Sequence, residues 1–188
     1  MKLYIKNMVS SRCITVVKEE LVKIGFHDFE VILGEVTLNE KIPAAQLNQI
    51  RSVLLRSGFE LLEDKKNILL QQIKTHIIQL VYYSDEPLVQ NLSVYLSDNL
   101  HHDYTYMSNL FSDRMGITIE KFIICHKIER VKELLTYGEL SLTDIAFKMH
   151  YSSVAHLSSQ FKKVTSMTPS DFKQLKGDKR DLLENLCK

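Results

Sequence analysis

Apolar residues in the first third of the chain follow two different periods. Leu3 and Ile5 alternate with Tyr4 and Lys6, which predicts a strand over residues 2–8. From Ser10 or Ser11 to Ile24 the apolar residues recur at helical spacing, which predicts a capped helix. The same two periods predict strands over 29–33 and 36–38, a helix over 43–57 and a strand over 59–62. The predicted order of elements is βαββαβ.

That order is the ferredoxin-like layout, in which two helices cover one face of a four-stranded antiparallel sheet. A further helix is predicted over residues 68–82, and no strand pattern recurs after it. The sequence therefore predicts an α+β protein whose second part is all-α. The expected boundaries are a ferredoxin-like domain over 1–66, a connector helix over 67–86, a helical domain over 87–176 and a tail over 177–188.

The helical part contains an internal repeat with an offset of 50 residues. At this offset apolar positions fall on apolar positions, as for Met107 and Leu157, and for Phe111 and Phe161. Each copy predicts a short helix, a polar break and a second helix. The repeat therefore indicates two copies of one helical unit.

Two short helices around a three- to four-residue break are the layout of a helix-turn-helix, here with the small Ala146 at the crossing. Ser141 and Asp144 predict a reciprocal cap for the helix that follows them, and Thr168 and Asp171 repeat this arrangement. A long helix over 118–137 joins the copies and spans about 30 Å. One turn of B-DNA is about 34 Å, so this spacing suits two successive major grooves. Two ordinary helical hairpins are the alternative.

The run MSNLFSDRMGITIEKFIICHKIERVKELLTYGELSLTDIAFKMHYSSVAHLSSQFKKVTSMTPSDFK resembles the DNA-binding domain of AraC-type bacterial transcriptional regulators. The resemblance covers roughly residues 88–176 and is most specific over LTDIAFKMHYSSVAHLSSQFKKVTSMTPSDFK. It implies two helix-turn-helix units, joined by a linker helix, that bind promoter DNA.

The resemblance also implies which residues contact DNA. In the first unit these are Tyr104, Thr105, Ser108 and Asn109. In the second they are Ser153, Val154, Ala155, His156, Ser158 and Ser159, with Lys162 and Lys163 near phosphates. These positions suit a face opposite Leu157, Phe161 and Val164.

The chemistry of these side chains fits base recognition. Asn109 can pair with adenine through two hydrogen bonds, and serine and histidine can donate to base edges. Ala155 or Val154 suits the methyl group of thymine. For any single serine, a solvated helix surface is an equally good interpretation.

Several positions depart from the family pattern. His150 and Ser166 stand where the family usually has glycine, and Gly116 keeps the second of these glycines in the first copy. A left-handed backbone at a non-glycine residue costs free energy. Residues 85–147 carry 5 Lys and Arg against 10 Asp and Glu, whereas residues 148–188 carry 8 against 4. We therefore expect the second unit to anchor the DNA complex.

The N-terminal segment NMVSSRCI resembles the metal loop of a heavy-metal-associated domain. Metal-binding members use two cysteines separated by two residues, because thiolates hold copper(I) or zinc. This chain has Ser10 and Cys13. Cys13, even with help from Met8, is a weak metal candidate, and we expect a degenerate domain that serves docking or dimerisation and holds no metal.

Composition excludes several classes of protein. Apolar residues make up 45% and charged residues 25%, as in ordinary globular proteins. There is no long apolar run and no secretory segment, so we expect a cytoplasmic protein with no membrane contact. The three cysteines lie far apart and predict no disulfide framework. No phosphate loop, serine elbow or paired catalytic carboxylates occur, so neither an enzyme nor a cofactor is predicted.

Together these observations predict a sequence-specific transcriptional regulator that binds double-stranded DNA. RNA polymerase, and a second copy bound through the N-terminal domain, are further expected partners. One alternative is a protein-interaction regulator with a degenerate DNA-binding domain. Another, less favoured by Ser10, is a metal-responsive sensor or carrier.

Overall fold

The structure is a computed structural model that describes residues 1–84, 86–87 and 90–174. These residues divide into two compact units. The first contains residues 1–76 and 96–103, and the second contains residues 77–95 and the chain from 104 onward. The predicted tail over 177–188 lies outside the described residues.

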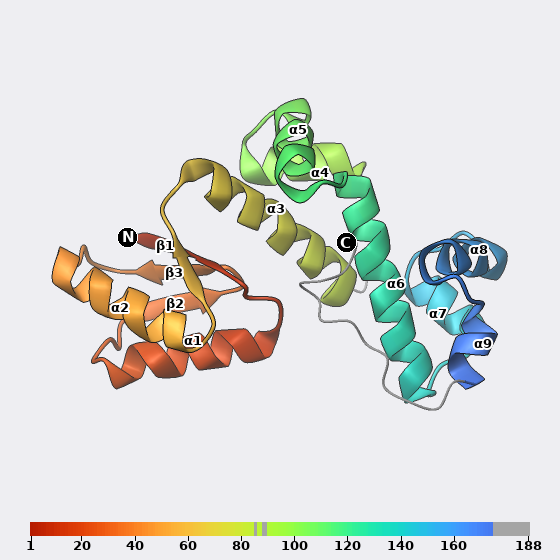
Figure 1. Ribbon diagram of the computed structural model, residues 1–188, viewed down its shortest axis with the longest axis horizontal. Coiled ribbons are helices and arrows are strands. Elements are labelled where there is room, and N and C mark those ends of the chain that lie inside the picture. Colours follow the sequence, from red (N-terminus) through yellow and green to blue (C-terminus); the bar gives the residue numbers. More distant parts are fainter. Residues whose placement is uncertain (85, 88–89, 175–188) are drawn as a thin grey trace. The chain divides into compact units, whose positions relative to one another are not determined.

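The first unit begins with four strands and two helices in the predicted order. They are β1 (Lys2–Lys6), α1 (Ser11–Lys23), β2 (Phe29–Ile32), β3 (Glu35–Leu38), α2 (Ala44–Arg56) and β4 (Glu60–Leu62). The strand order is β2-β3-β1-β4, and each pair of neighbours is antiparallel. Helices α1 and α2 contact each other beside the sheet (Figure 1). The predicted order βαββαβ is confirmed.

The core of the first unit follows from the two-residue period of its strands. Leu3 lies opposite Val36 and Ile5 opposite Leu61, so these four side chains share one face of the sheet. All four are buried. The helices contribute Val17, Leu21, Ile50 and Leu54, which have no exposed surface. Burial of such apolar surface is the main force that stabilises this unit.

Gly34 turns the chain between β2 and β3. Its φ of +77° lies in the left-handed region, which glycine adopts without strain. A Cβ at this position would come within 2.8 Å of the Thr75 hydroxyl of α3 (Lys65–Tyr82). A side chain is therefore excluded here both by the backbone and by α3.

The remaining elements are helical. They are α4 (Leu92–Leu100), α5 (Tyr104–Met115), α6 (Ile119–Tyr137), α7 (Leu142–Lys148), α8 (Val154–Thr165) and α9 (Pro169–Gln174). In the second unit α6 is the central helix, and α5, α7, α8 and α9 all contact it (Figure 1). The described part of the chain holds no helix long and apolar enough to cross a membrane.

The predicted helix caps can be compared with the structure one by one. Ser141 and Asp144 form the predicted capping box at the start of α7. Thr168 and Asp171 bond reciprocally at the start of α9, also as predicted. Ser10 stands at the cap position of α1, but its side chain makes no capping bond and lies 3.5 Å from the Cys13 sulfur. Caps are local, which explains why the sequence predicts most of them.

The prediction that Val164 lies on the buried face of α8 is wrong. Leu157 and Phe161 are fully buried, but Val164 is 42% exposed. Phe161 packs edge-on against Phe172 of α9, with ring centroids 5.6 Å apart. Helical spacing places Val164 near these two residues, but spacing alone does not ensure that a neighbouring element covers the last turn.

Candidate nucleic-acid interface

Helix α8 presents one exposed, mostly polar face. Leu157 and Phe161 anchor the opposite face in the core. The exposed residues recur three or four positions apart and so share one side of the helix; they are Ala155, His156, Ser159, Lys162 and Lys163. Val154 and Ser158 are half-buried at its margin. The structure thus brings together on α8 the predicted contact residues of the second helix-turn-helix unit.

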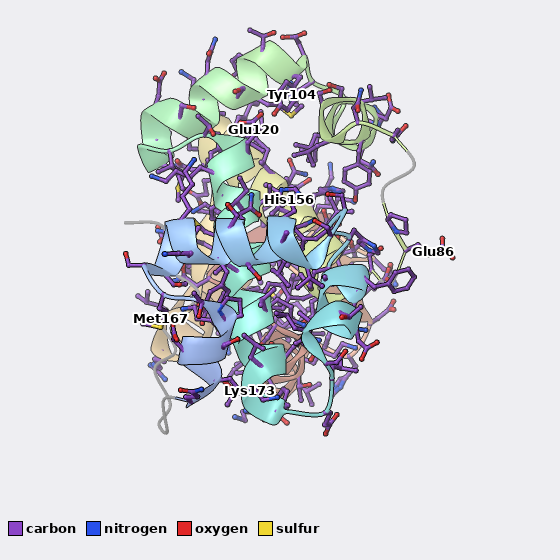
Figure 2. All side chains as sticks on the ribbon, turned by 90° about the vertical axis from the view of Figure 1, so that its right-hand side faces the viewer. Glu86, Tyr104, Glu120, His156, Met167 and Lys173 are labelled. Atoms are coloured by element: carbon purple, nitrogen blue, oxygen red, sulfur yellow. The ribbon has the colours of Figure 1, made fainter. Side chains whose placement is uncertain are left out.

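The start of α8 is fixed by its own side chains. Ser153 is the N-cap, and its hydroxyl accepts a hydrogen bond of 3.1 Å from the His156 backbone N–H. The Ser152 hydroxyl lies 3.1 Å from Nδ1 of the His156 ring. Figure 2 shows His156 on α8, which lies across α6 in that view. The His156 ring therefore has a defined partner before any ligand binds.

The turn before α8 carries a partly buried tyrosine. The Tyr151 hydroxyl donates a hydrogen bond of 2.6 Å to Oε1 of Gln160, and the Tyr151 ring meets the His156 ring edge-on at 5.3 Å. Burial raises the pKa of Tyr151 to about 12, so its hydroxyl stays protonated and can donate. Tyr151 thus connects the turn to two successive turns of α8.

Helix α5 is held to α6 at its first residue. The Tyr104 hydroxyl donates a hydrogen bond of 2.5 Å to a carboxylate oxygen of Glu120, and both residues are labelled in Figure 2. Burial and this bond raise the pKa of Tyr104, and the bond lowers the pKa of Glu120. The hydroxyl of Tyr104, one of the predicted DNA contacts, is therefore already bonded to another residue of the chain.

The other predicted contacts on α5 are accessible. Thr105 and Asn109 are exposed and lie four positions apart on one side of the helix, and Ser108 is half-buried. Asp103 and Asp113 are also exposed. The first helix-turn-helix unit thus offers hydrogen-bonding side chains among acidic residues, whereas the end of α8 is basic.

The two non-glycine residues at expected glycine positions do adopt left-handed backbone. His150 has a φ of 56° and Ser166 a φ of 65°. Gly116, which corresponds to Ser166 in the first copy, has a φ of 71°. The duplicated backbone is therefore kept at this position although the residue type differs. His101, after α4, has a φ of 55°, one residue away from the position that an offset of 50 assigns to His150.

In the described part of the chain, the predicted weak metal candidate Cys13 belongs to no cluster of metal-binding side chains. Cys13 is half-buried and free, and Met8, its suggested helper, is fully buried. Over residues 1–84, 86–87 and 90–174 no group of three or more histidine, cysteine, aspartate or glutamate side chains could hold a metal ion.

Sequence reasoning missed the residues that support α5 and α8 from behind. These are Glu120 and Lys127 on α6 and Tyr151 in the turn. A usable signal was present for Tyr151, because an aromatic residue in the short turn between two helices needs a place to pack. The partner of a charged residue on α6 depends on which helix lies across it, and spacing does not give this.

Comparison with known proteins finds matches to the helical region. Residues 96–175 match the family model described as a helix-turn-helix domain. An uncharacterised HTH-type transcriptional regulator of Staphylococcus aureus strain MSSA476 is 26% identical in an alignment 175 positions long, and the alignment covers 79% of this chain and 23% of that protein. Another from Staphylococcus aureus is 30% identical over 123 residues, 65% of this chain and 15% of that protein. The chain thus spans less than a quarter of the length of these relatives.

A solved structure agrees in fold. The C-terminal domain of AraT, a response regulator from Geobacillus stearothermophilus, superposes with a TM-score of 0.51 and 20% identity, over 63% of this chain and 95% of that one. In chain order the long helix α6 follows α5 and precedes α7, where the sequence predicts a linker helix. Residues 96–175 are thus similar to a helix-turn-helix domain in sequence, and the chain is similar in fold to this solved domain.

Proposed function

We propose that the chain is a sequence-specific DNA-binding transcriptional regulator that inserts α5 and α8 into successive major grooves. The observation that carries the proposal is the exposed face of α8, where His156, Ser159, Lys162 and Lys163 stand on one side of a helix anchored by Phe161. Hydrogen-bonding groups at the start of such a helix suit base edges, and lysines at its end suit phosphates.

The second helix-turn-helix unit is proposed as the anchor of the complex. In α8 the two lysines of the last turn are exposed, and no acidic residue lies in its first turn. Each phosphate neutralised by a lysine releases counterions, which favours binding. The contacts proposed for α8 are Ser153, Val154, Ala155, His156, Ser158, Ser159, Lys162 and Lys163.

The first helix-turn-helix unit is proposed to contribute fewer phosphate contacts than the second. Asp103 and Asp113 are exposed near α5 and repel the DNA backbone. Thr105, Ser108 and Asn109 remain the proposed base contacts. Tyr104 is also proposed to face DNA through its ring, with its hydroxyl engaged by Glu120. Reading by α5 thus adds selectivity to the affinity that α8 supplies.

The length of α6 supports simultaneous binding by both units. Its 19 residues span about 28 Å at about 1.5 Å per residue. That length is close to the turn of about 34 Å that separates successive major grooves on one side of B-DNA.

For the first unit we propose the ferredoxin-like topology, since the strand order β2-β3-β1-β4 and the contact between α1 and α2 support it. We propose that it corresponds to a degenerate heavy-metal-associated domain over residues 1–66 that pairs two copies of the chain. The connector over 67–86 and the DNA-binding domain over 87–176 complete this proposed division. RNA polymerase is a further proposed partner.

The proposal is tested by selection from a random library of DNA duplexes with the purified full chain. Enrichment of a motif with two half-sites about one helical turn apart is expected, because α5 and α8 read successive grooves. Binding to the enriched duplex should fall steeply as salt rises. Recovery of no motif, together with equal affinity for all duplexes, contradicts sequence-specific binding.

A protein-interaction regulator is the second candidate. Phe147 on α7 is 84% exposed, which is unusual for a phenylalanine in a helix whose Ile145 and Ala146 are buried. An exposed aromatic residue of this kind suits a protein contact. Salt-insensitive capture of a protein partner that requires Phe147, with no DNA retention, would favour this candidate over the first.

A further inference from the structure

The turn between α7 and α8 holds a non-glycine residue in left-handed backbone. Met149 ends α7, and His150 follows it with a φ of 56°. Left-handed backbone at a residue with a Cβ costs about 1 kcal/mol or more. Such a turn needs support from its surroundings if it is to hold one conformation.

Lys127 of α6 supplies support from behind the turn. Its Nζ donates a hydrogen bond of 3.0 Å to the Met149 carbonyl and lies 5.3 Å from the centre of the Tyr151 ring. The side chain is half-buried, and burial lowers the pKa of Lys127. Removal of a lysine from water is unfavourable unless its charge finds partners. Here a backbone carbonyl and an aromatic face are those partners.

From the turn, two contacts continue into α8. Tyr151 bonds to Gln160 at 2.6 Å, and its ring edge packs on His156. Ser152 holds Nδ1 of the same His156 ring at 3.1 Å. Residues 149–152 therefore contact Lys127 of α6 on one side and His156, a proposed base contact, on the other.

We infer that Lys127 is a positioning residue for DNA reading: it fixes the turn through Met149 and Tyr151 and so orients His156 toward a base edge without itself contacting DNA. This inference rests on the proposed function. It separates Lys127 from Lys162 and Lys163, whose exposed side chains are proposed to meet phosphates.

The test uses the full chain and two duplexes, one enriched by selection with the unchanged protein and one with the same base composition in scrambled order. Lys127→Met keeps the length of the side chain but removes the donor and the charge. We expect about a tenfold loss of affinity for the enriched duplex and less than about a twofold loss for the scrambled one, because only base reading depends on orientation. The salt dependence should not change, since no phosphate contact is lost.

Two further variants separate positioning from general damage. Lys127→Arg keeps a cation and donors, so it should restore most of the preference for the enriched duplex. Lys41→Met removes the same charge from an exposed site in the first unit and should change neither affinity. If Lys127→Met does not fold, as judged by circular dichroism, Tyr151→Phe takes its place. That variant removes only the bond to Gln160 and should lower the preference about threefold.

Three outcomes would overturn the inference. One is equal loss on both duplexes with a salt slope smaller by about one, which marks a direct phosphate contact. The second is unchanged affinity for both duplexes. The third is a loss that Lys127→Arg does not restore. A failure of the unchanged protein to enrich any motif contradicts the proposed function instead, so the two failures are distinguishable.

Discussion

Tyr104 donates a hydrogen bond of 2.5 Å to Glu120, and this contact ties the first residue of α5 to the first turn of α6. An edge-on contact between Phe111 and Phe122, at 5.2 Å between ring centroids, holds the same two helices further along. One polar and one aromatic contact thus help to fix the orientation of α5 on α6.

Tyr104→Phe is expected to lower the free energy of unfolding by about 1 kcal/mol, because it removes this hydrogen bond to a charged acceptor but keeps the ring. Urea denaturation followed by circular dichroism measures the change. Tyr4→Phe, which removes a hydroxyl from a half-buried position on β1, serves as the control and should have a smaller effect. Equal stability of Tyr104→Phe and the unchanged protein would show that the bond to Glu120 contributes nothing.

The same pair predicts a dependence on pH. The hydrogen bond from Tyr104 lowers the pKa of Glu120 in the folded state. A lowered pKa contributes stability that is fully present above the unfolded value, near 4.3, and is lost as pH falls through the folded value. The difference in unfolding free energy between the unchanged protein and Tyr104→Phe should therefore be larger at pH 7 than at pH 3. A difference that grows in acid would contradict this assignment.

Removal of both phosphate-facing lysines should weaken binding to every duplex alike. The double variant Lys162→Ala and Lys163→Ala is expected to reduce the salt slope by about two, since each phosphate contact contributes about 0.9. Fluorescence anisotropy over a series of salt concentrations measures the slope. A selective loss on the enriched duplex, with the slope unchanged, would instead indicate that these lysines contact bases.

Substitution of the proposed base contacts should change which sequences are bound. Asn109→Ala and His156→Ala are each expected to relax selection at one position of the motif and to cost about 1–3 kcal/mol in affinity there. Repeated selection with each variant, followed by sequencing, measures this. Motifs identical to that of the unchanged protein would exclude both side chains from base recognition.

The internal repeat offers a matched pair of substitutions at two positions with left-handed backbone. Gly116 and Ser166 occupy corresponding positions with φ of 71° and 65°. Ser166→Gly should stabilise the chain, and Gly116→Ser should destabilise it, each by up to about 1 kcal/mol, because only glycine adopts this backbone without strain. The space around Gly116 is open, so no clash complicates the comparison. Thermal unfolding of both variants measures the effect, and a shift of the same sign in both would refute it.

Local features of this protein were determined by the sequence alone. The order of strands and helices, the capping box of Ser141 and Asp144, and the cap of Thr168 and Asp171 all depend on residues a few positions apart. Caps and turns are satisfied within one turn of chain, so their residue types are sufficient to predict them. The repeat also depends only on spacing, and it led to the helix-turn-helix interpretation.

Only the tertiary structure decided what each helix face meets. Val164 has the spacing of a core residue and is exposed, whereas Lys127 has the composition of a surface residue and supports a turn 22 residues away. Tyr104 suits a DNA contact by sequence, yet its hydroxyl is bonded to Glu120. Periodicity fixes the face on which a residue lies, but the neighbour on that face comes from another part of the chain, and its identity depends on how the helices cross.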